Sequence, residues 1–282
     1  PWMAEPKRTW TYLQRVSNSY ARQPTLPNSN QQKGRTEMTS LPWLDQKQLW
    51  FPDPEQALDD PDGLLAIGGD LSTERLVLAY QSGIFPWFSD DQPILWWSPD
   101  PRCVLFPPEI HIAKSLRRTL NSQYFTITAD RAFSRVIRLC AQIRAEGTWI
   151  TEDMIASYSK LHREGVAHSI EAWNPKGELV GGMYGLALDR CFFGESMFSL
   201  ETNASRVLMV HLARQLETWG YAIMDCQVES GHLLRMGART LPRRAFLSIL
   251  RESVSEGPGH DRWNIQWRWP GPERPIKGIA EG

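Results

Sequence analysis

The sequence predicts an α+β fold with a mixed, largely antiparallel sheet. Between residues 130 and 164, apolar residues recur at helical spacing, and after residue 166 they alternate as in strands. Three consecutive strands then follow. A helix separates the third strand from a fourth, and this order fits a mixed sheet that is largely antiparallel.

Composition indicates a globular protein. Of the 282 residues, 41% are hydrophobic and 22% are charged, and the net charge is -1. Bulk charge therefore does not indicate a nucleic-acid partner, which would need a local basic patch. No apolar run approaches the ~20 residues of a membrane span. The four cysteines are scattered without metal-ligand spacing, so we expect reduced thiols and no metal.

The N-terminal part changes character along its length. Residues 1–40 predict a disordered extension, because PTLPNSNQQKGRT is polar and has no hydrophobic period. A turn-rich stretch follows. Residues 72–83 then predict a helix with Ser72 as N-cap and Gly83 beyond its end.

The rest of the chain predicts helices first and strands later. The stretch ILWWSPDPRCVLF predicts a strand interrupted at Pro99. Helices are predicted at 111–120, 130–147 with Asp130 as N-cap, 151–164, 203–220 with Asn203 as N-cap, 233–237 and 243–250. Strands are predicted at 169–173, 178–188, 191–199 and 221–227.

Glu195 lies in the apolar stretch RCFFGESMFS. Because side chains alternate along a strand, Glu195 should share a face with Phe193 and Met197, where an unpaired carboxylate is costly. We therefore expect a cation to meet it. The alternatives are a structural ion pair, for instance with Arg206, and a site that holds a cationic substrate.

Asp225 and Gln227 raise the same question in the apolar strand IMDCQV. Their spacing of two residues predicts that they share one face. They form either a hydrogen-bonded polar network at the strand end or the lining of a cleft where the sheet opens. Because a second strand also carries a buried acid, the functional interpretation is favoured.

Two further features concern ligands. The segment MFSLETNASRV lacks the glycine-rich turn that binds the pyrophosphate of coenzyme A at a helix N-terminus, which disfavours that cofactor. Asn203, Ser205 and Arg206 remain available for a phosphate. Trp87 and Trp149 lie at element boundaries, where an exposed ring can stack on a base or simply anchor the fold.

Long strings of this sequence resemble the leucyl/phenylalanyl-tRNA–protein transferase family. They run in unbroken order over about residues 51–250 and are GLLAIGGDL, AYQSGIFPWF, PILWWSPDPR, GTWIT, HSIEAW, LVGGMYG, FFGESMFS, NAS, DCQ and PRR. The resemblance implies a small N-terminal domain over 41–105, a GNAT-like acyltransferase domain over 106–255 and a variable C-terminal tail over 256–282.

The resemblance also implies an activity. Members of this family transfer Leu or Phe, and less well Met, from leucyl-tRNA or phenylalanyl-tRNA to proteins that begin with Arg or Lys. The product is marked for degradation by the N-end rule. Because the family uses neither coenzyme A nor a metal, we expect no cofactor, and we expect a cytoplasmic monomer without membrane attachment.

Site roles carry over from the family residue by residue. The implied catalytic residues are Glu195, Asp225 and Gln227. The implied substrate contacts are Trp87, Trp149, Met183, Phe192, Met197, Asn203 and Ser205, and the implied tRNA contacts are Lys114, Arg117, Arg118 and Arg206. This chain has Arg206 where the family commonly has Lys, and Arg235-Met236-Gly237-Ala238 where Ser-Leu-Gly-Ala is usual. The second departure affects a local contact of that loop.

The implied reaction is aminolysis of an ester. A free α-amine has a pKa of roughly 7.7–8.0, so a strong general base is not required and positioning should dominate. The amide oxygen of Gln227, polarised by Asp225, would accept a hydrogen bond from the amine, or the ribose 2′-hydroxyl would carry the proton. Rival interpretations are a coenzyme A-dependent N-acetyltransferase, a non-catalytic adaptor for N-terminal residues and a cell-wall aminoacyl transferase.

Overall fold

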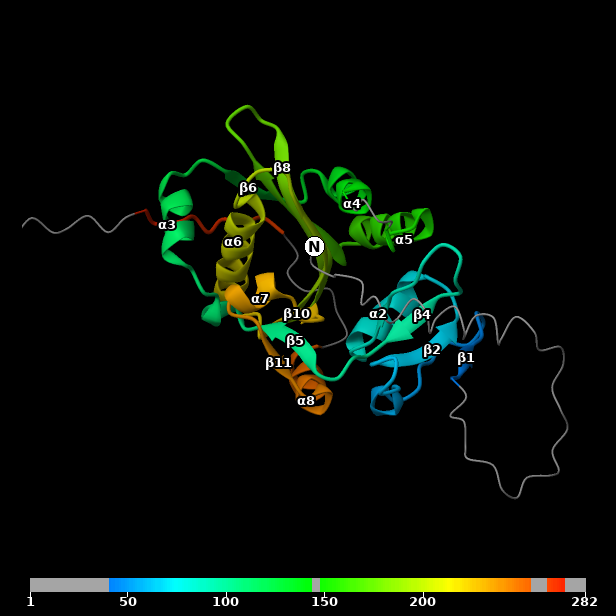
Figure 1. The fold of residues 1–282 in the computed structure, drawn as a ribbon. Helices are drawn as coiled ribbons and strands as arrows, with labels where there is room; N and C mark the ends of the chain where they lie inside the picture. The colour runs from blue at the N-terminus through cyan, green and yellow to red at the C-terminus, as the bar shows by residue number, and fades with distance from the viewer. Residues whose placement is uncertain (1–40, 144–147, 255–262, 272–282) are drawn as a thin grey trace, which may run out of the picture.

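The computed structural model describes residues 41–143, 148–254 and 263–271. These residues form a small sheet and a large sheet with helices packed around them (Figure 1). The predicted α+β class is confirmed. The predicted extension at 1–40 and the predicted helix end at Gly147 lie outside the described residues.

The small sheet belongs to the N-terminal part. Its strand order is β1-β2-β4-β3. The strands are β1 (Trp43–Leu44), β2 (Leu64–Gly68), β3 (Phe85–Pro86) and β4 (Leu95–Trp97), and two helices accompany them, η1 (Pro54–Gln56) and α2 (Thr73–Gln81). The Ser72 side chain accepts a hydrogen bond from the backbone N–H of Arg75, which confirms the predicted N-cap.

The large sheet has the strand order β11-β5-β10-β9-β8-β7-β6. Its strands are β5 (Arg102–Leu105), β6 (Thr126–Ala129), β7 (Ala167–Trp173), β8 (Leu179–Leu188), β9 (Cys191–Ser199), β10 (Ile223–Gln227) and β11 (Arg239–Leu241). β9 and β10 pair in parallel, and the other pairs of this sheet are antiparallel, so the sheet is mixed and largely antiparallel, as the sequence predicts. β5, which the expected boundary at residue 105 assigns to the N-terminal domain, belongs here because its partners β10 and β11 come from the C-terminal part.

Helices cover both faces of the large sheet. They are η2 (Pro107–Glu109), α3 (Lys114–Asn121), α4 (Phe133–Gln142), α5 (Glu152–Arg163), α6 (Ala204–Thr218), α7 (Gly231–Arg235) and α8 (Arg243–Ser253). A side chain at Gly181 would meet Ala204 of α6 at 2.9 Å, whereas one at Gly182 would meet Val136 of α4 at 3.0 Å. Because neighbouring strand residues point to opposite faces, α6 and α4 lie on opposite sides of the sheet (Figure 1).

Thr151 forms a cap that was not predicted, whereas Asp130 and Asn203 test predicted caps. Thr151 caps α5, since its side chain accepts a hydrogen bond from the N–H of Met154. Asp130 is not a cap. Its carboxylate accepts instead from the N–H of Ser169 and contacts His168, because a φ of 56° turns the chain before α4 begins. Asn203 precedes α6 but makes no side-chain capping bond, since its φ of 68° directs the amide away from the first turn.

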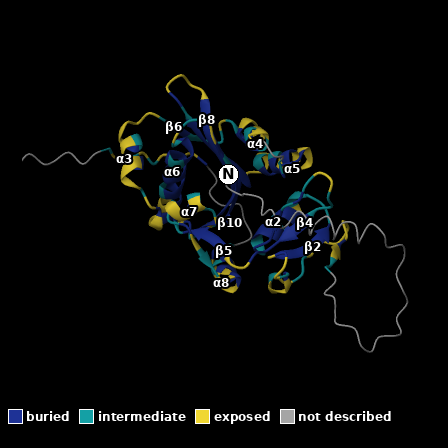
Figure 2. Ribbon diagram, viewed as in Figure 1, coloured by how far each residue is buried: buried dark blue, intermediate teal, exposed yellow. Residues whose placement is uncertain are grey.

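A segment that follows the last helix packs back on the fold. Residues 263–271, called here the C-terminal strap, have no regular secondary structure, and Trp263 and Ile265 in it are buried. The side chain of Gln215, itself buried in α6, accepts hydrogen bonds from the N–H groups of Gln266 and Trp267. In Figure 2 the strands of the large sheet and α6 are mostly buried, whereas α3 is largely exposed.

Candidate active site

Irregular strand pairing shapes the site. Along β8 and β9 the register passes from Gly185↔Gly194 to Tyr184↔Ser196, so Glu195 is an extra residue on β9. Such a bulge re-aims side chains. It places Phe193, paired with Leu186, and Met197, paired with Met183, on opposite faces, because Leu186 and Met183 are an odd number of residues apart. The predicted shared face of Phe193, Glu195 and Met197 is therefore wrong.

A second irregularity lies on β10. The register to β5 shifts between Asp225 and Gln227, and Gln227 has a φ of 61°. A positive φ is uncommon for a residue other than glycine and is typical of strained functional positions. The pairing of β10 with β9 reaches Asp225↔Phe193, so Glu195 and Gln227 both follow the last paired position.

Neutral hydrogen-bond donors surround Glu195. Tyr80 Oη donates to Oε1 at 2.6 Å, Gln227 Nε2 donates to Oε1 at 2.8 Å, and Tyr158 Oη lies 3.2 Å from Oε2. All four side chains are buried. Among the described residues, no Lys, Arg or His forms an ion pair with Glu195. The structural ion pair expected with a residue such as Arg206 is therefore not formed within the described residues, because two phenols and an amide contact the carboxyl instead.

The protonation of Glu195 follows from counting protons. The hydroxyls of Tyr80 and Tyr158 also contact each other, so three oxygen–oxygen contacts form a triangle with Glu195. Two phenols supply only two protons for these three contacts. When Glu195 is protonated it can donate to one phenol, and that phenol then donates to the other. Burial raises the pKa of Glu195 from 4.5 to about 7, while the hydrogen bonds from Tyr80, Gln227 and Tyr158 oppose that rise. The Glu195 carboxyl therefore changes between its neutral and charged forms near pH 7.

Gln227 carries an unused acceptor. Its Nε2 is committed to Glu195, and its backbone N–H donates to Asp225 Oδ1 at 2.9 Å. Its side-chain oxygen is buried, and no group in the described part of the chain donates to it. A buried acceptor without a donor costs free energy, so this oxygen is the point where an incoming N–H group can bind.

Asp225 forms a buried ion pair. Arg102 donates to its carboxylate through Nε at 2.9 Å and Nη2 at 2.7 Å, and both side chains are at most 1% exposed. The guanidinium lies between the rings of Phe85 and Phe246. Asp225 thus contacts the backbone of Gln227 and not its amide oxygen. The expected polarisation of that oxygen is not seen, because both groups are acceptors.

The other predicted substrate contacts are spread around this centre. Met183 and Phe192 are fully buried, and Phe192 packs on Trp263 of the C-terminal strap. Trp87 is half-buried beside Trp97. Trp149 is only 3% exposed, which favours the anchoring role over the stacking role among the two alternatives for this ring.

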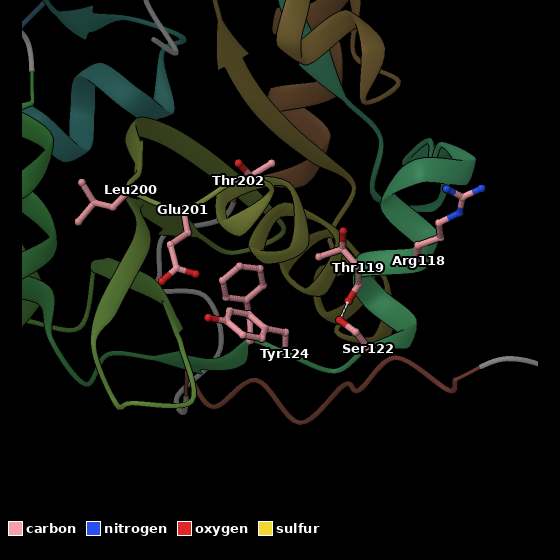
Figure 3. Close-up of a pocket in the computed structure, with 8 residues that line it drawn as sticks. Arg118, Thr119, Ser122, Tyr124, Leu200, Glu201 and Thr202 are labelled. Carbon is pink, nitrogen blue, oxygen red and sulfur yellow. Dashed lines mark hydrogen bonds between the residues drawn. The ribbon is translucent and has the colours of Figure 1, made fainter.

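The predicted phosphate-binding residues lie near α6 and α3. Asn203 donates to Thr119 of α3 at 3.0 Å, Ser205 is buried in the first turn of α6, and Arg206 is half-buried. Lys114, Arg117 and Arg118 are exposed on α3. Arg118 borders a hollow of about 640 Å³ on the surface between α3 and the end of β9, with Leu200, Glu201 and Thr202 on its far side (Figure 3).

Three residues that contact Glu195 or Asp225 were not predicted from the sequence. Tyr80, Tyr158 and Arg102 come from α2, α5 and β5, and each reaches β9 or β10 across a long sequence separation. Both tyrosines sit at apolar positions of amphipathic helices, where a core role is the ordinary interpretation. A buried Arg in the apolar run RCVLF was the one available signal.

The described residues contain no cluster of three or more His, Cys, Asp or Glu side chains placed to hold a metal ion. Within the same residues, no helix combines the length and apolar character needed to cross a membrane. The polar centre consists of one titratable carboxyl, one free amide oxygen and neutral donors. These groups can hold and orient an amine without supplying a strong base.

The fold and the site define a two-part α+β protein with a buried carboxyl–amide pair where two parallel strands separate. The family model for the leucyl/phenylalanyl-tRNA protein transferase matches residues 104–251, and that for the N-terminal domain of the same family matches residues 69–100. This chain belongs to the leucyl/phenylalanyl-tRNA–protein transferase family, and it is an aminoacyltransferase.

Relatives match over most of their length. Leucyl/phenylalanyl-tRNA–protein transferases from Hahella chejuensis and Nitrosomonas europaea are 56% and 54% identical, over 79% and 78% of this chain and 95% and 94% of theirs. Among solved structures, L-PGS from Bacillus licheniformis has a TM-score of 0.33 at 13% identity, covering 55% of this chain and 51% of that one. A GCN5-related N-acetyltransferase from Kribbella flavida has a TM-score of 0.31 at 9% identity, covering 59% of each chain. Likenesses this weak carry no argument about mechanism.

Proposed function

We propose that this chain transfers a leucyl or phenylalanyl group, and less readily a methionyl group, from aminoacyl-tRNA to the N-terminal Arg or Lys of an acceptor protein. The family matches support aminoacyl transfer from tRNA to protein. The observation that carries the proposed chemistry is the free amide oxygen of Gln227 beside the poised carboxyl of Glu195. The product would enter N-end-rule degradation.

Attack by the amine requires position more than basicity. A free α-amine has a pKa of roughly 7.7–8.0, so a useful fraction is neutral near pH 7. The Gln227 oxygen accepts one hydrogen bond from that amine and aims its lone pair at the ester carbonyl. The new amide bond forms as the ester C–O bond breaks, and the amine proton leaves through the ribose hydroxyl or water. Holding both substrates in this geometry can lower the barrier by roughly 7–11 kcal/mol at best.

Glu195 would bind a positively charged group of one of the substrates. The donor's α-ammonium and the acceptor's basic first residue both bring positive charge. A cation beside a carboxyl whose pKa is about 7 lowers that pKa and releases the proton. The resulting carboxylate then holds the cation through a charge-assisted hydrogen bond. Asp225, already neutralised by Arg102, positions Gln227 and does not bind substrate.

The remaining roles follow the family. Met183, Phe192 and Met197 would surround the transferred side chain, since flexible methionines adapt to Leu, Phe and Met alike. Trp87, which is half-buried, would contact the terminal adenosine, whereas the buried Trp149 would only pack behind that contact. The basic residues of α3 would contact the acceptor stem. We propose that the protein acts in the cytoplasm, where aminoacyl-tRNA is present, and acts as a monomer.

The test uses purified protein with labelled Leu-tRNA or Phe-tRNA, peptides that begin with Arg, Lys or Ala, and no coenzyme A. We expect transfer to the Arg and Lys peptides only. Glu195→Gln should reduce the rate on the order of 100-fold, as loss of one site electrostatic contact does elsewhere, with thermal unfolding at pH 7 retained as the control. Transfer that is unchanged in Glu195→Gln would make Glu195 a structural residue, and transfer that depends on coenzyme A would reject the proposed donor.

A further inference from the structure

A second pocket lies away from the candidate active site. It has a volume of about 220 Å³ and lies between α3, β6, α6 and the C-terminal strap. It shares Thr119, Tyr124 and Phe125 with the surface hollow of Figure 3. This volume is below the roughly 300–1,000 Å³ of pockets for drug-sized ligands, so it suits one ring system.

A buried histidine contributes an unused acceptor to this pocket. His211 is 6% exposed, and its Nδ1 lies 2.8 Å from the carbonyl oxygen of Val207. A carbonyl only accepts, so Nδ1 carries the proton and Nε2 carries a lone pair. Burial lowers the pKa of His211 to about 4, so the ring is neutral. No group in the described ranges donates to Nε2.

A tryptophan of the C-terminal strap also borders this pocket, and its ring is held by a hydrogen bond. Trp269 of the C-terminal strap lines the pocket, and its Nε1 donates to Asn121 Oδ1 of α3 at 2.7 Å. The strap itself is fixed by Gln215, whose Oε1 accepts from two successive backbone N–H groups at 2.7 Å each. Because the ring is already ordered, a ligand that stacks on it loses little further conformational entropy in the protein.

Charge around the pocket favours an anionic ligand. The lining includes Arg268 and no carboxylate. Arg268 uses Nη1 on two carbonyls of the strap, which leaves other guanidinium N–H groups available. The exposed Arg117 and Arg118 lie on the same helix as the lining residue Thr119. Aromatic, hydrogen-bonding and cationic groups together match a nucleotide better than an acidic peptide, which has no ring for Trp269.

We propose that the pocket between α3, α6 and the C-terminal strap binds one unpaired base of the tRNA, upstream of its 3′-terminal adenosine. This inference rests on the proposed use of aminoacyl-tRNA. The base stacks on Trp269, its exocyclic amino group donates to His211 Nε2, and its phosphate meets Arg268. Adenine, cytosine and guanine carry such an amino group and uracil does not. His211 lies seven residues, about 10 Å, along α6 from Ala204, the first residue of that helix.

The first experiment compares two donors that differ only in the tRNA body, phenylalanyl-tRNA and phenylalanyl-adenosine. Trp269→Ala should raise the KM for phenylalanyl-tRNA about tenfold, as loss of one base stack does, and leave the KM for phenylalanyl-adenosine unchanged. Trp43→Ala is the matched control, because Trp43 is an exposed tryptophan of the small sheet that does not line the pocket; Trp267 is unsuitable because its ring packs on both Trp269 and His211. Equal losses with both donors, or a change confined to the KM of the acceptor peptide, would overturn the proposal.

The second experiment measures binding without transfer, so its outcome does not depend on the proposed catalysis. Acceptor-stem minihelices carry an abasic site at each unpaired position in turn. At one position the abasic site should weaken binding to the wild type but not to Trp269→Ala. His211→Phe should also weaken binding, and His211→Gln, which keeps an acceptor, should restore part of it. If every abasic minihelix loses the same affinity with both proteins, the pocket does not hold a base.

Discussion

Two carboxylates on neighbouring strands, Glu195 and Asp225, are both fully buried but are neutralised in different ways. Asp225 receives a bidentate Arg102 at 2.7 and 2.9 Å. Glu195 receives two phenols and an amide and no cation from the described residues. The first charge is compensated by the protein itself. The second is left for a proton or for a substrate cation.

The two acids therefore differ in role, since Asp225 helps to hold the fold together and Glu195 can respond to substrate. The Asp225–Arg102 pair joins β10 to the N-terminal part, since Arg102 also donates to the carbonyl of Gly83 and lies over Phe85. An ion pair that is already complete does not change when substrate arrives. A carboxyl with a pKa near 7 does, because a small change in its surroundings moves it between its charged and neutral forms.

The largest expected effect comes from breaking the compensated pair. Arg102→Met keeps an apolar chain of similar length but leaves Asp225 buried and unpaired. We expect the free energy of unfolding to fall by about 3–5 kcal/mol, as measured by chemical denaturation at pH 7. Arg239→Met removes an exposed pair with Glu109 and should cost less than about 1 kcal/mol. Similar losses in the two variants would show that Arg102 contributes no more than a surface pair.

A second prediction concerns pH. The folded-state pKa of Glu195, about 7, lies above its ordinary value of 4.5, so between these values the folded protein keeps a proton that the unfolded chain loses. Stability should therefore fall as pH rises through this window and level off above it. Relative to Glu195→Gln, the wild type should lose on the order of 3 kcal/mol between pH 4.5 and 7.5. Parallel pH profiles for the two proteins would mean that the carboxyl is already charged at pH 5.

The smallest expected effect compares how strongly Tyr80 and Tyr158 each lower the pKa of Glu195. The hydrogen bond from Tyr80 is shorter than that from Tyr158, 2.6 against 3.2 Å, and both lower the pKa of Glu195. In Tyr80→Phe the pKa of Glu195 should therefore rise, by an amount equivalent to about 1 kcal/mol, so that stability levels off at a higher pH. Tyr158→Phe should produce a smaller rise. Denaturation across a pH series measures both shifts. A downward shift in either variant would contradict the arrangement of donors.

Local patterns predicted much of the fold. Changes of hydrophobic period and turn signals located the strands that became β7, β8, β9 and β10, and the element order predicted a mixed, largely antiparallel sheet. The cap at Ser72 followed from side-chain chemistry. Asp130 failed as a cap because its carboxylate bonds to Ser169, 39 residues away, and propensity does not include so distant a partner.

For the site, the sequence predicted which strand residues take part but not which side chains they contact. The sequence identified Glu195, Asp225 and Gln227 as acids and an amide that apolar strands would bury. It gave the wrong partner for Glu195, because strict alternation ignores a bulge and because Tyr80 lies 115 residues away. The family resemblance supplied the reaction but not the proton count around the carboxyl.

The sequence by itself determined which groups are buried and in what order the elements follow, because hydrophobic period and capping act over a few residues. The tertiary structure alone decided which acid meets an arginine and which meets two phenols. That choice depends on contacts between α2, α5, β5 and the separated ends of β9 and β10, and no local pattern specifies contacts between segments so far apart in the chain.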